Sequence, residues 1–97
     1  YEADLLIAKK SNRERTQKAL TVALEAVGQL KELTLEQIEL ALRGAAKNAE
    51  LADGELLWTV RVALSGRAAS PGTFELIEVF GRDEALKRLK SGLKKLG

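Results

Sequence analysis

The residues best suited to chemistry stand close together, between positions 58 and 73 of the chain. Trp58, Arg61 and Ser65 follow one another at three- and four-residue steps, so a helix would place them on one side. The loop sequence SGRAASPG comes next and contains the only proline, Pro71. A guanidinium near a helix start with free N–H groups suits a nucleic-acid base edge or a phosphate. From these residues alone, ordinary capping and packing remain the simpler explanation.

Groups that commonly perform catalysis are scarce in this sequence. It contains no histidine and no cysteine. The commonest general base, the commonest zinc ligand, thiolate metal sites and disulfide bonds are therefore all excluded. We expect no catalytic residue, no metal site and no independent enzymatic activity.

The composition predicts one helical domain. The chain has 97 residues, of which only 4% are aromatic. It begins with Tyr1 rather than Met, and we expect it to be a piece of a longer protein. No apolar run approaches the roughly 18 residues of a membrane span, and no signal peptide is visible, so we expect a cytoplasmic protein that does not enter a membrane.

The charge is distributed unevenly along the chain. Residues 1–54 contain eight Lys and Arg against nine Asp and Glu, a net charge of −1. Residues 55–97 contain eight against five, a net charge of +3. The basic half also holds the loop sequence, which is compatible with a polyanionic partner but is not specific to one.

Caps and apolar periodicity predict an all-α bundle of about five helices without a sheet. The expected helices cover residues 12–29, 35–49 and 55–64, then one from Pro71 to a stop at Gly81, and one after Asp83. Their expected N-caps are Ser11, Thr34, Asp53, Ser70 and Asp83. We assign residues 1–10 to a linker or to the end of a preceding helical bundle, and residues 11–97 to the domain.

The stretch LLWTVRVALSGRAASPGTFELIEVFGRDEALKRL resembles the closing segment of bacterial-type glutamyl-tRNA synthetases. That family has an Arg-Val-Ala-Leu-Thr-Gly run, a short loop with Pro-Gly, then Phe-Glu, a helix ending in Gly and a helix ending in Arg-Leu. The likeness is close over residues 55–89 and looser upstream. It implies an α-helix cage that binds the tRNA anticodon. The whole enzyme, a class I aminoacyl-tRNA synthetase, joins glutamate to its tRNA with ATP and magnesium, but its two catalytic signatures are absent here.

The resemblance also implies a set of contact residues and a partner. The residues expected to surround the second and third anticodon bases are Arg61, Ser70, Pro71 and Thr73, with Arg61 at the third base. Those expected to support them are Trp58, Ser65, Gly66 and Arg67. The implied partner is the anticodon loop of tRNA(Glu), bound by a monomer with no cofactor in this segment and no affinity for DNA. Thr59 departs from the family, which usually has proline there.

Two other classes of binding protein remain as alternatives. A helical protein-interaction module would need an exposed apolar groove, whereas the apolar stripes here are expected to be used in internal packing. A helix-turn-helix DNA binder is suggested by the short Gly-Arg-Asp connection before the last helix. The polar face of that helix carries a lysine stripe, defined as Lys87, Lys90 and Lys94, which offers little to distinguish base edges.

Overall fold

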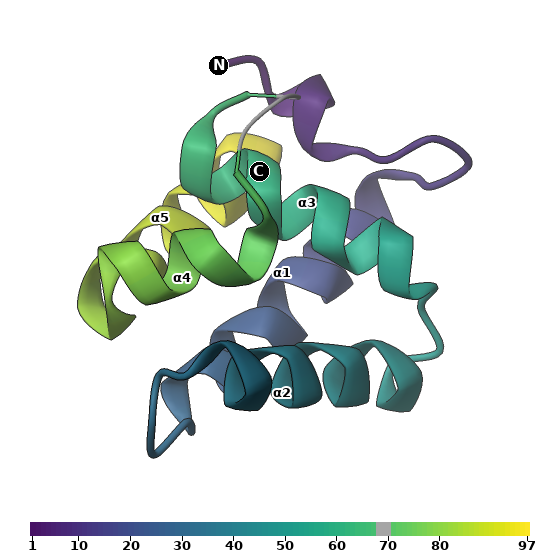
Figure 1. Cartoon of the computed structure of the whole chain (residues 1–97). Helices are drawn as coiled ribbons and strands as arrows, with labels where there is room; N and C mark the ends of the chain where they lie inside the picture. The colour runs from purple at the N-terminus through teal and green to yellow at the C-terminus, as the bar shows by residue number, and fades with distance from the viewer. Residues whose placement is uncertain (68–70) are drawn as a thin grey trace.

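The structure, a computed structural model, describes residues 1–67 and 71–97. Within these residues it contains five α-helices, one short 3-10 helix and no strand (Figure 1). The prediction of an all-α bundle is therefore confirmed. The elements in chain order are η1 (Ala3–Leu6), α1 (Arg13–Gly28), α2 (Leu35–Asn48), α3 (Asp53–Ser65), α4 (Thr73–Phe80) and α5 (Arg82–Leu96).

Helix α3 is the centre of the bundle. It contacts α1, α2, α4, α5 and the N-terminal η1. In Figure 1, α2 lies below it, α4 and α5 lie to one side, and the N-terminal segment passes above it. This position explains why α3 is apolar around most of its circumference, with Leu56, Val60, Val62 and Leu64 all fully buried.

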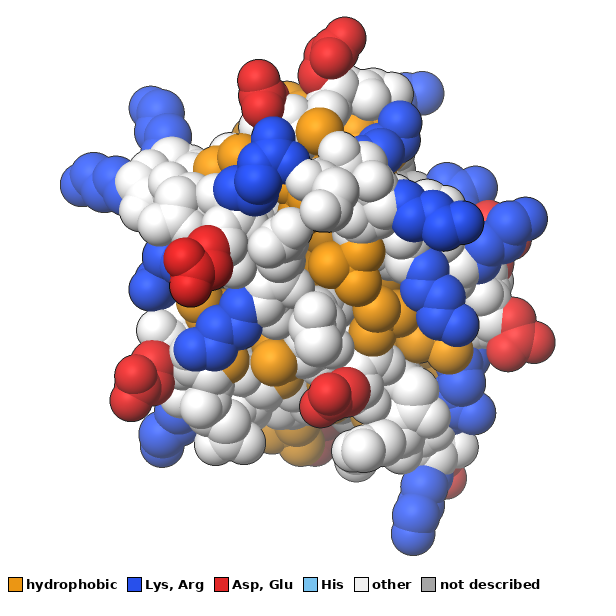
Figure 2. All heavy atoms as spheres, turned by 180° about the vertical axis from the view of Figure 1, so that it is seen from behind, with side chains coloured by type: hydrophobic (Ala, Val, Ile, Leu, Met, Phe, Trp, Pro, Cys, Tyr) orange, Lys and Arg blue, Asp and Glu red, His pale blue; other side chains and the backbone are white. Residues whose placement is uncertain are grey.

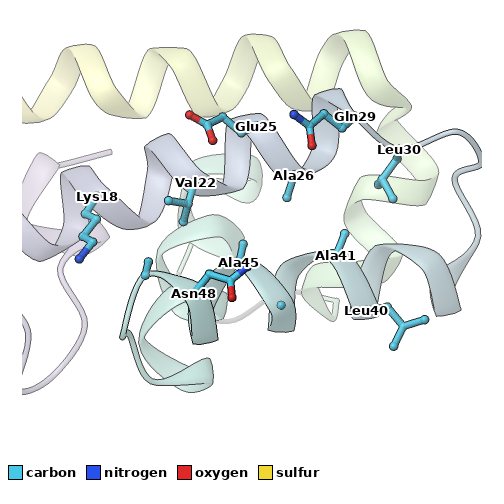
Figure 3. Close-up of a pocket in the computed structure, with 12 residues that line it drawn as sticks. Lys18, Val22, Glu25, Ala26, Gln29, Leu30, Leu40, Ala41, Ala45 and Asn48 are labelled. Carbon is cyan, nitrogen blue, oxygen red and sulfur yellow. The ribbon is translucent and has the colours of Figure 1, made fainter.

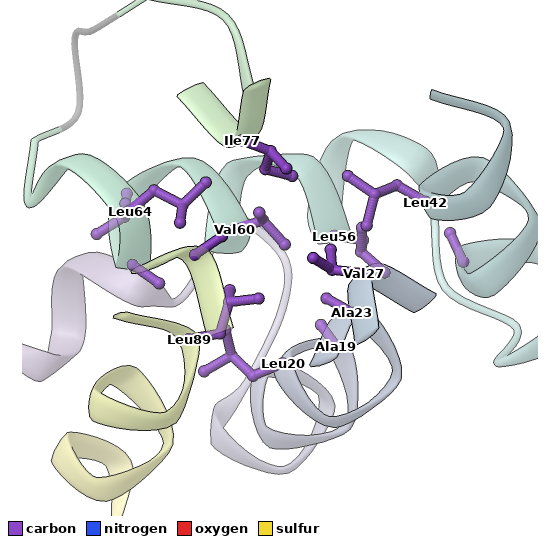
Figure 4. Close-up of a cluster of buried hydrophobic side chains, with 14 of the residues drawn as sticks. Ala19, Leu20, Ala23, Val27, Leu42, Leu56, Val60, Leu64, Ile77 and Leu89 are labelled. Atoms are coloured by element: carbon purple, nitrogen blue, oxygen red, sulfur yellow. The ribbon is translucent and has the colours of Figure 1, made fainter. Parts of the chain in front are cut away.

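The core lies where α1, α3 and α5 meet. Leu20, Ala23 and Val27 of α1 face Leu56, Val60 and Leu64 of α3, and Leu89 of α5 closes the space between them (Figure 4). Gly92 allows α5 to approach closely, because a β-carbon there would lie 3.3 Å from the β-carbon of Ala63. The core thus depends on contacts between helices far apart in the sequence.

The start of α1 differs from the prediction. Ser11 is not the N-cap; the side chain of Asn12 accepts the N–H of Arg15 at 2.8 Å instead. The Ser11 hydroxyl donates to the Glu55 carboxylate on α3 at 2.6 Å. The hydroxyl that the local pattern predicted to cap α1 therefore forms a hydrogen bond with a residue of another helix instead. The predicted cap at Thr34 is confirmed, since its hydroxyl accepts an N–H from the first turn of α2.

Two further predicted caps are wrong. Asp53 is the first residue of α3 rather than its cap, and the Glu55 side chain reaches back to accept the N–H of Ala52 at 3.2 Å. Asp83 lies inside the first turn of α5, which begins directly after Gly81. Both carboxylates still lie near the positive end of a helix dipole, where a negative charge is favourable.

The two predicted glycine stops are confirmed. Gly66 ends α3 with φ 73° and Gly81 ends α4 with φ 84°, both in the region that favours glycine. Because α5 follows Gly81 directly, the link between α4 and α5 is a single residue. Within the described residues, no helix combines the length and apolar character of a membrane span.

Residues 1–10 pack against the helices. Leu6 is fully buried, and its carbonyl oxygen accepts the Thr59 hydroxyl at 2.8 Å. The ring of Tyr1 lies against Gly66 at the end of α3, and the Lys95 ammonium lies 4.8 Å from the centroid of that ring. The first ten residues are thus part of the same packed unit.

Candidate nucleic-acid interface

Helix α3 places Trp58 and Arg61 on one side, as their spacing predicts. The central carbon of the Arg61 guanidinium lies 5.6 Å from the centroid of the Trp58 ring. Within residues 1–67 and 71–97, the Arg61 Nε atom is buried and has no hydrogen-bond partner, and the side chain forms no ion pair. Within the described residues, the terminal nitrogens of Arg61 have no hydrogen-bond partner either, whereas its Nε is buried and out of reach of a bound molecule.

The loop begins at a fixed point on α3. The Ser65 hydroxyl lies 2.8 Å from the Arg61 carbonyl oxygen and accepts the N–H of Arg67 at 3.2 Å. Gly66 makes the corner between these two residues in the left-handed conformation. Arg67 is exposed at this corner. The expected supporting residues Ser65, Gly66 and Arg67 are therefore consecutive parts of one turn.

The far side of the loop is anchored through Thr73. The sequence predicts that α4 begins at Pro71 with Ser70 as its N-cap. The helix instead begins at Thr73, so the predicted start at Pro71 is wrong. The Thr73 hydroxyl donates to the Leu57 carbonyl oxygen on α3 at 3.1 Å, which fixes where the first turn forms. Pro71 is exposed just before it, and Ser70 lies outside the described residues.

Arg61 lies between the two points where the loop meets α3. On one side is Ser65, one turn towards the C-terminus; on the other is Leu57, one turn towards the N-terminus, which holds Thr73. The structure therefore brings Arg61 and Thr73 to neighbouring turns of the same surface. The Thr73 side chain is only 8% exposed and its hydroxyl is bonded to the Leu57 carbonyl oxygen, so this hydroxyl is not available to a ligand.

The N-terminus of α4 already carries a negative charge. The Glu75 carboxylate lies against Gly72, in the space that a β-carbon there would need. A phosphate at the same position would be repelled by this carboxylate, although the helix dipole by itself attracts anions. The surface is therefore better suited to the polar edge of a base than to a phosphate.

One contact of this surface was not expected from the sequence. The Trp58 indole N–H donates to the Leu5 carbonyl oxygen at 2.9 Å, across 53 residues of sequence. The run Leu5-Leu6-Ile7 is the only local signal for it, because three adjacent apolar residues in a segment assigned to a linker indicate a buried contact. The N-terminal segment is thus part of the support of the site.

The lysine stripe lies on α5, away from the core. Its three side chains are exposed, and no ion pair or hydrogen bond within the described residues engages them. Seen from behind, Lys and Arg side chains stand around the outline of the molecule, with Asp and Glu dispersed among them (Figure 2). This distribution provides general attraction for a polyanion. The three lysines also border a surface hollow, together with Asp83, Leu86 and Ser91.

A groove of about 610 Å³ lies between α1 and α2 (Figure 3). Ala26, Ala41 and Ala45 line it, and Leu40 stands at its edge with 61% of its surface exposed. Leu40 is not part of the apolar stripe expected on α2; within that stripe Leu35, at 41% exposed, is the residue for which the expectation of internal packing is wrong. Nothing in the described part of the chain indicates what would cover this groove, so it does not favour an interaction module.

Comparisons with known proteins agree with the resemblance. The glutamate–tRNA ligase of Clostridium kluyveri is 37% identical over 99 residues, which cover 99% of this chain and 20% of the relative. The glutamate–tRNA ligase of Clostridium novyi is 39% identical over 88 residues, which cover 90% of this chain and 18% of the relative. The glutamate–tRNA ligase of Clostridium tetani is 35% identical over 99 residues, which cover 99% of this chain and 20% of the relative. The chain therefore spans about a fifth of the length of the curated relatives it matches.

The family match extends over nearly the whole chain. Residues 1–93 match the family described as the anticodon binding domain, which includes the N-terminal segment as well as all the residues of the candidate surface. The curated relatives are matched in their C-terminal region, where the sequence resemblance places this segment. The prediction from the sequence is confirmed, and the chain belongs to the anticodon-binding domain family.

Proposed function

We propose that this chain binds tRNA through the anticodon loop, as the C-terminal part of a glutamate–tRNA ligase specific for tRNA(Glu). The family match over residues 1–93 carries the proposal. The geometry supports it, because the Arg61 guanidinium, which has no ion pair within the described residues, and the first turn of α4 lie on the same side of α3. Anticodon bases are unstacked in the loop of a tRNA, so their edges are accessible to such donors.

Each residue of the proposed site has a separate task. Arg61 donates to the edge of the third anticodon base, and its planar guanidinium fixes the orientation of that base. Pro71 and Thr73 border the second and third bases. Ser70 lies outside the described residues and is assigned to the same bases by the family resemblance alone. Phosphate contacts elsewhere in the enzyme contribute most of the affinity, and this surface contributes selectivity.

The chemistry of ligation takes place outside this chain. The proposed enzyme uses ATP and magnesium to join glutamate to its tRNA at a site formed by other residues of the longer protein, and this segment supplies no catalytic group. We propose that it acts as a monomer in the cytoplasm and that it does not bind DNA. The four residues Arg61, Ser70, Pro71 and Thr73 are then a recognition site alone.

The test uses the full-length ligase that contains this chain and compares Arg61→Ala with the parent. We expect the KM for tRNA(Glu) to rise by a factor that corresponds to about 1–3 kcal/mol, the typical value of one base-edge contact. The penalty for changing the third anticodon base should fall by a similar factor. The KM values for ATP and glutamate should not change, because their site lies elsewhere.

Two further variants separate recognition from charge and from packing. Arg61→Lys keeps the positive charge but lacks the planar fork, so it should lose the third-base penalty as Arg61→Ala does. Arg43→Ala is a control for loss of an arginine over an aromatic ring, since Arg43 lies 5.8 Å from the centroid of Phe74. It also removes the ion pairs to Glu39 and Asp53, so it should cost stability but leave the third-base penalty unchanged. If a correctly folded Arg61→Ala enzyme rejects third-base changes as strongly as the parent, the proposed contact is wrong.

A further inference from the structure

Arg61 differs from the other arginines near the centre of the bundle in what holds its side chain. Arg15, Arg43 and Arg88 each form an ion pair with a carboxylate, at 2.6 to 2.8 Å. Within the described residues, the Arg61 side chain has neither an ion pair nor a hydrogen bond. Its guanidinium lies over the ring of Trp58. A free arginine side chain samples many rotamers, so an arginine that must bind a base benefits from a neighbour that limits its motion.

Trp58 is itself fixed from the opposite end of the chain. Its indole N–H donates to the Leu5 carbonyl oxygen at 2.9 Å, and the neighbouring Thr59 hydroxyl donates to the Leu6 carbonyl oxygen at 2.8 Å. The same N-terminal segment reaches the loop corner, where the Tyr1 ring lies against Gly66. The segment therefore contacts α3 on both sides of Arg61.

From these contacts we infer that Trp58 is a positioning residue for anticodon recognition: the N-terminal segment fixes the indole ring, and the ring holds the Arg61 guanidinium in the orientation that binds the third anticodon base. The inference rests on the proposed function of Arg61. It differs from a simple packing role, because the ring would then support the core without affecting which base is preferred. It also assigns a part in recognition to residues 1–7, which lie more than 50 residues from the loop in sequence.

The proposed role predicts a specific effect of Trp58→Leu, measured with the full-length ligase. The substitution removes the ring but keeps an apolar side chain at a half-buried position. Affinity for tRNA(Glu) should fall about two- to fivefold, the range expected for one exposed arginine–aromatic contact. Affinity for the same tRNA with a changed third base should stay the same. In the Arg61→Ala background, Trp58→Leu should have no further effect on the third-base penalty.

Two controls distinguish positioning from general packing. Phe80→Leu removes a matched arginine–aromatic contact, because the guanidinium carbon of Arg88 lies 4.2 Å from the centroid of that ring. It should leave the third-base penalty unchanged. Trp58→Phe keeps an aromatic face but loses the N–H to Leu5, and it should lose part of the penalty while melting close to the parent. If Trp58→Leu does not fold, Trp58→Phe replaces it in the comparison with Arg61→Ala.

The possible outcomes separate the two proposals. Two results would overturn the positioning role alone. One is that Trp58→Leu lowers affinity equally for the cognate tRNA and for the tRNA with a changed third base. The other is that Trp58→Leu reduces the third-base penalty just as much when Arg61→Ala is already present. A normal third-base penalty in Arg61→Ala would overturn the proposed function of Arg61 and the positioning role together.

Discussion

The Glu55 carboxylate should make the stability of this chain strongly dependent on pH in the acid range. Arg15 binds it with two hydrogen bonds, from Nε at 2.7 Å and from the second terminal nitrogen at 2.8 Å. Ser11 and the N–H of Ala52 donate to it as well, and its side chain is only 9% exposed. The hydrogen bonds from Arg15 are the largest cause that lowers the pKa of Glu55 to about 2, against an opposing contribution from burial.

The magnitude follows from the difference between the folded and unfolded pKa. A lowering from 4.5 to about 2 corresponds to about 3 kcal/mol, at 1.36 kcal/mol per unit. Because solvent reaches Arg15, we expect about 2–3 kcal/mol in practice. The folded pKa lies below the unfolded value, so the stabilisation is complete above pH 4.5 and disappears as the pH falls towards 2.

The assay compares the parent chain with Glu55→Gln by urea denaturation at several pH values between 7 and 2. Near pH 7 the variant should be less stable by about 2–3 kcal/mol, and the difference should shrink as the parent carboxylate becomes protonated. Glu84→Gln is the matched control, because its partner Arg88 lies one turn away and both side chains are well exposed. The free energy of unfolding of Glu84→Gln should differ much less from that of the parent. A parent–variant difference for Glu55 that is constant over the whole range would refute the reasoning.

Three other expectations concern stability and binding. Gly66→Ala should destabilise the chain by about 1–2 kcal/mol because its φ is positive and the new β-carbon would meet the Tyr1 ring at 3.2 Å. Gly81→Ala should cost at least as much, because its combination of φ 84° and ψ 166° is adopted almost only by glycine; a variant at either position that melts like the parent would contradict this. Gly44→Ala should raise stability by about 0.5–1 kcal/mol, since this exposed helical position has free space for a β-carbon, and a lower melting temperature would show otherwise. Changing the whole lysine stripe to glutamine should lower the slope of log affinity against log salt by about 2 for RNA, equally for cognate and anticodon-changed tRNA; a loss for the cognate alone would mean that the stripe recognises sequence.

The sequence predicted those features of the fold that depend only on residues within a single helix. Apolar periodicity located the helices, and the glycines at positions 66 and 81 marked two of their ends, because both signals depend on local backbone geometry. Helix starts were predicted less well. The Ser11 hydroxyl binds Glu55 and the Thr73 hydroxyl binds the Leu57 carbonyl, so partners on another helix decided the role of each side chain. No pattern of neighbouring residues contains that information.

The candidate site divides in the same way. The proximity of Trp58 and Arg61 follows from their spacing on one helix, and the structure confirms it. The bond from Trp58 to Leu5 joins segments 53 residues apart, and the position of the Glu75 carboxylate over Gly72 depends on a helix start that was predicted too early. Both features require the tertiary arrangement.

The pairing of α1 with α5 has a consequence for how the chain folds during its synthesis. Arg13, at the start of α1, donates to the carbonyl oxygen of Leu96, 83 residues later, and Leu20 of α1 packs against Gly92 of α5. At a translation rate of roughly 5–20 residues per second, α5 follows the start of α1 by about 4–17 seconds. During that interval α1 can pack against α2 and α3, but the part of its apolar side that α5 covers has no final partner on the ribosome. Contacts between such distant segments close late and slow the folding of a helical protein, so the core of this domain forms only after nearly the whole chain has been made.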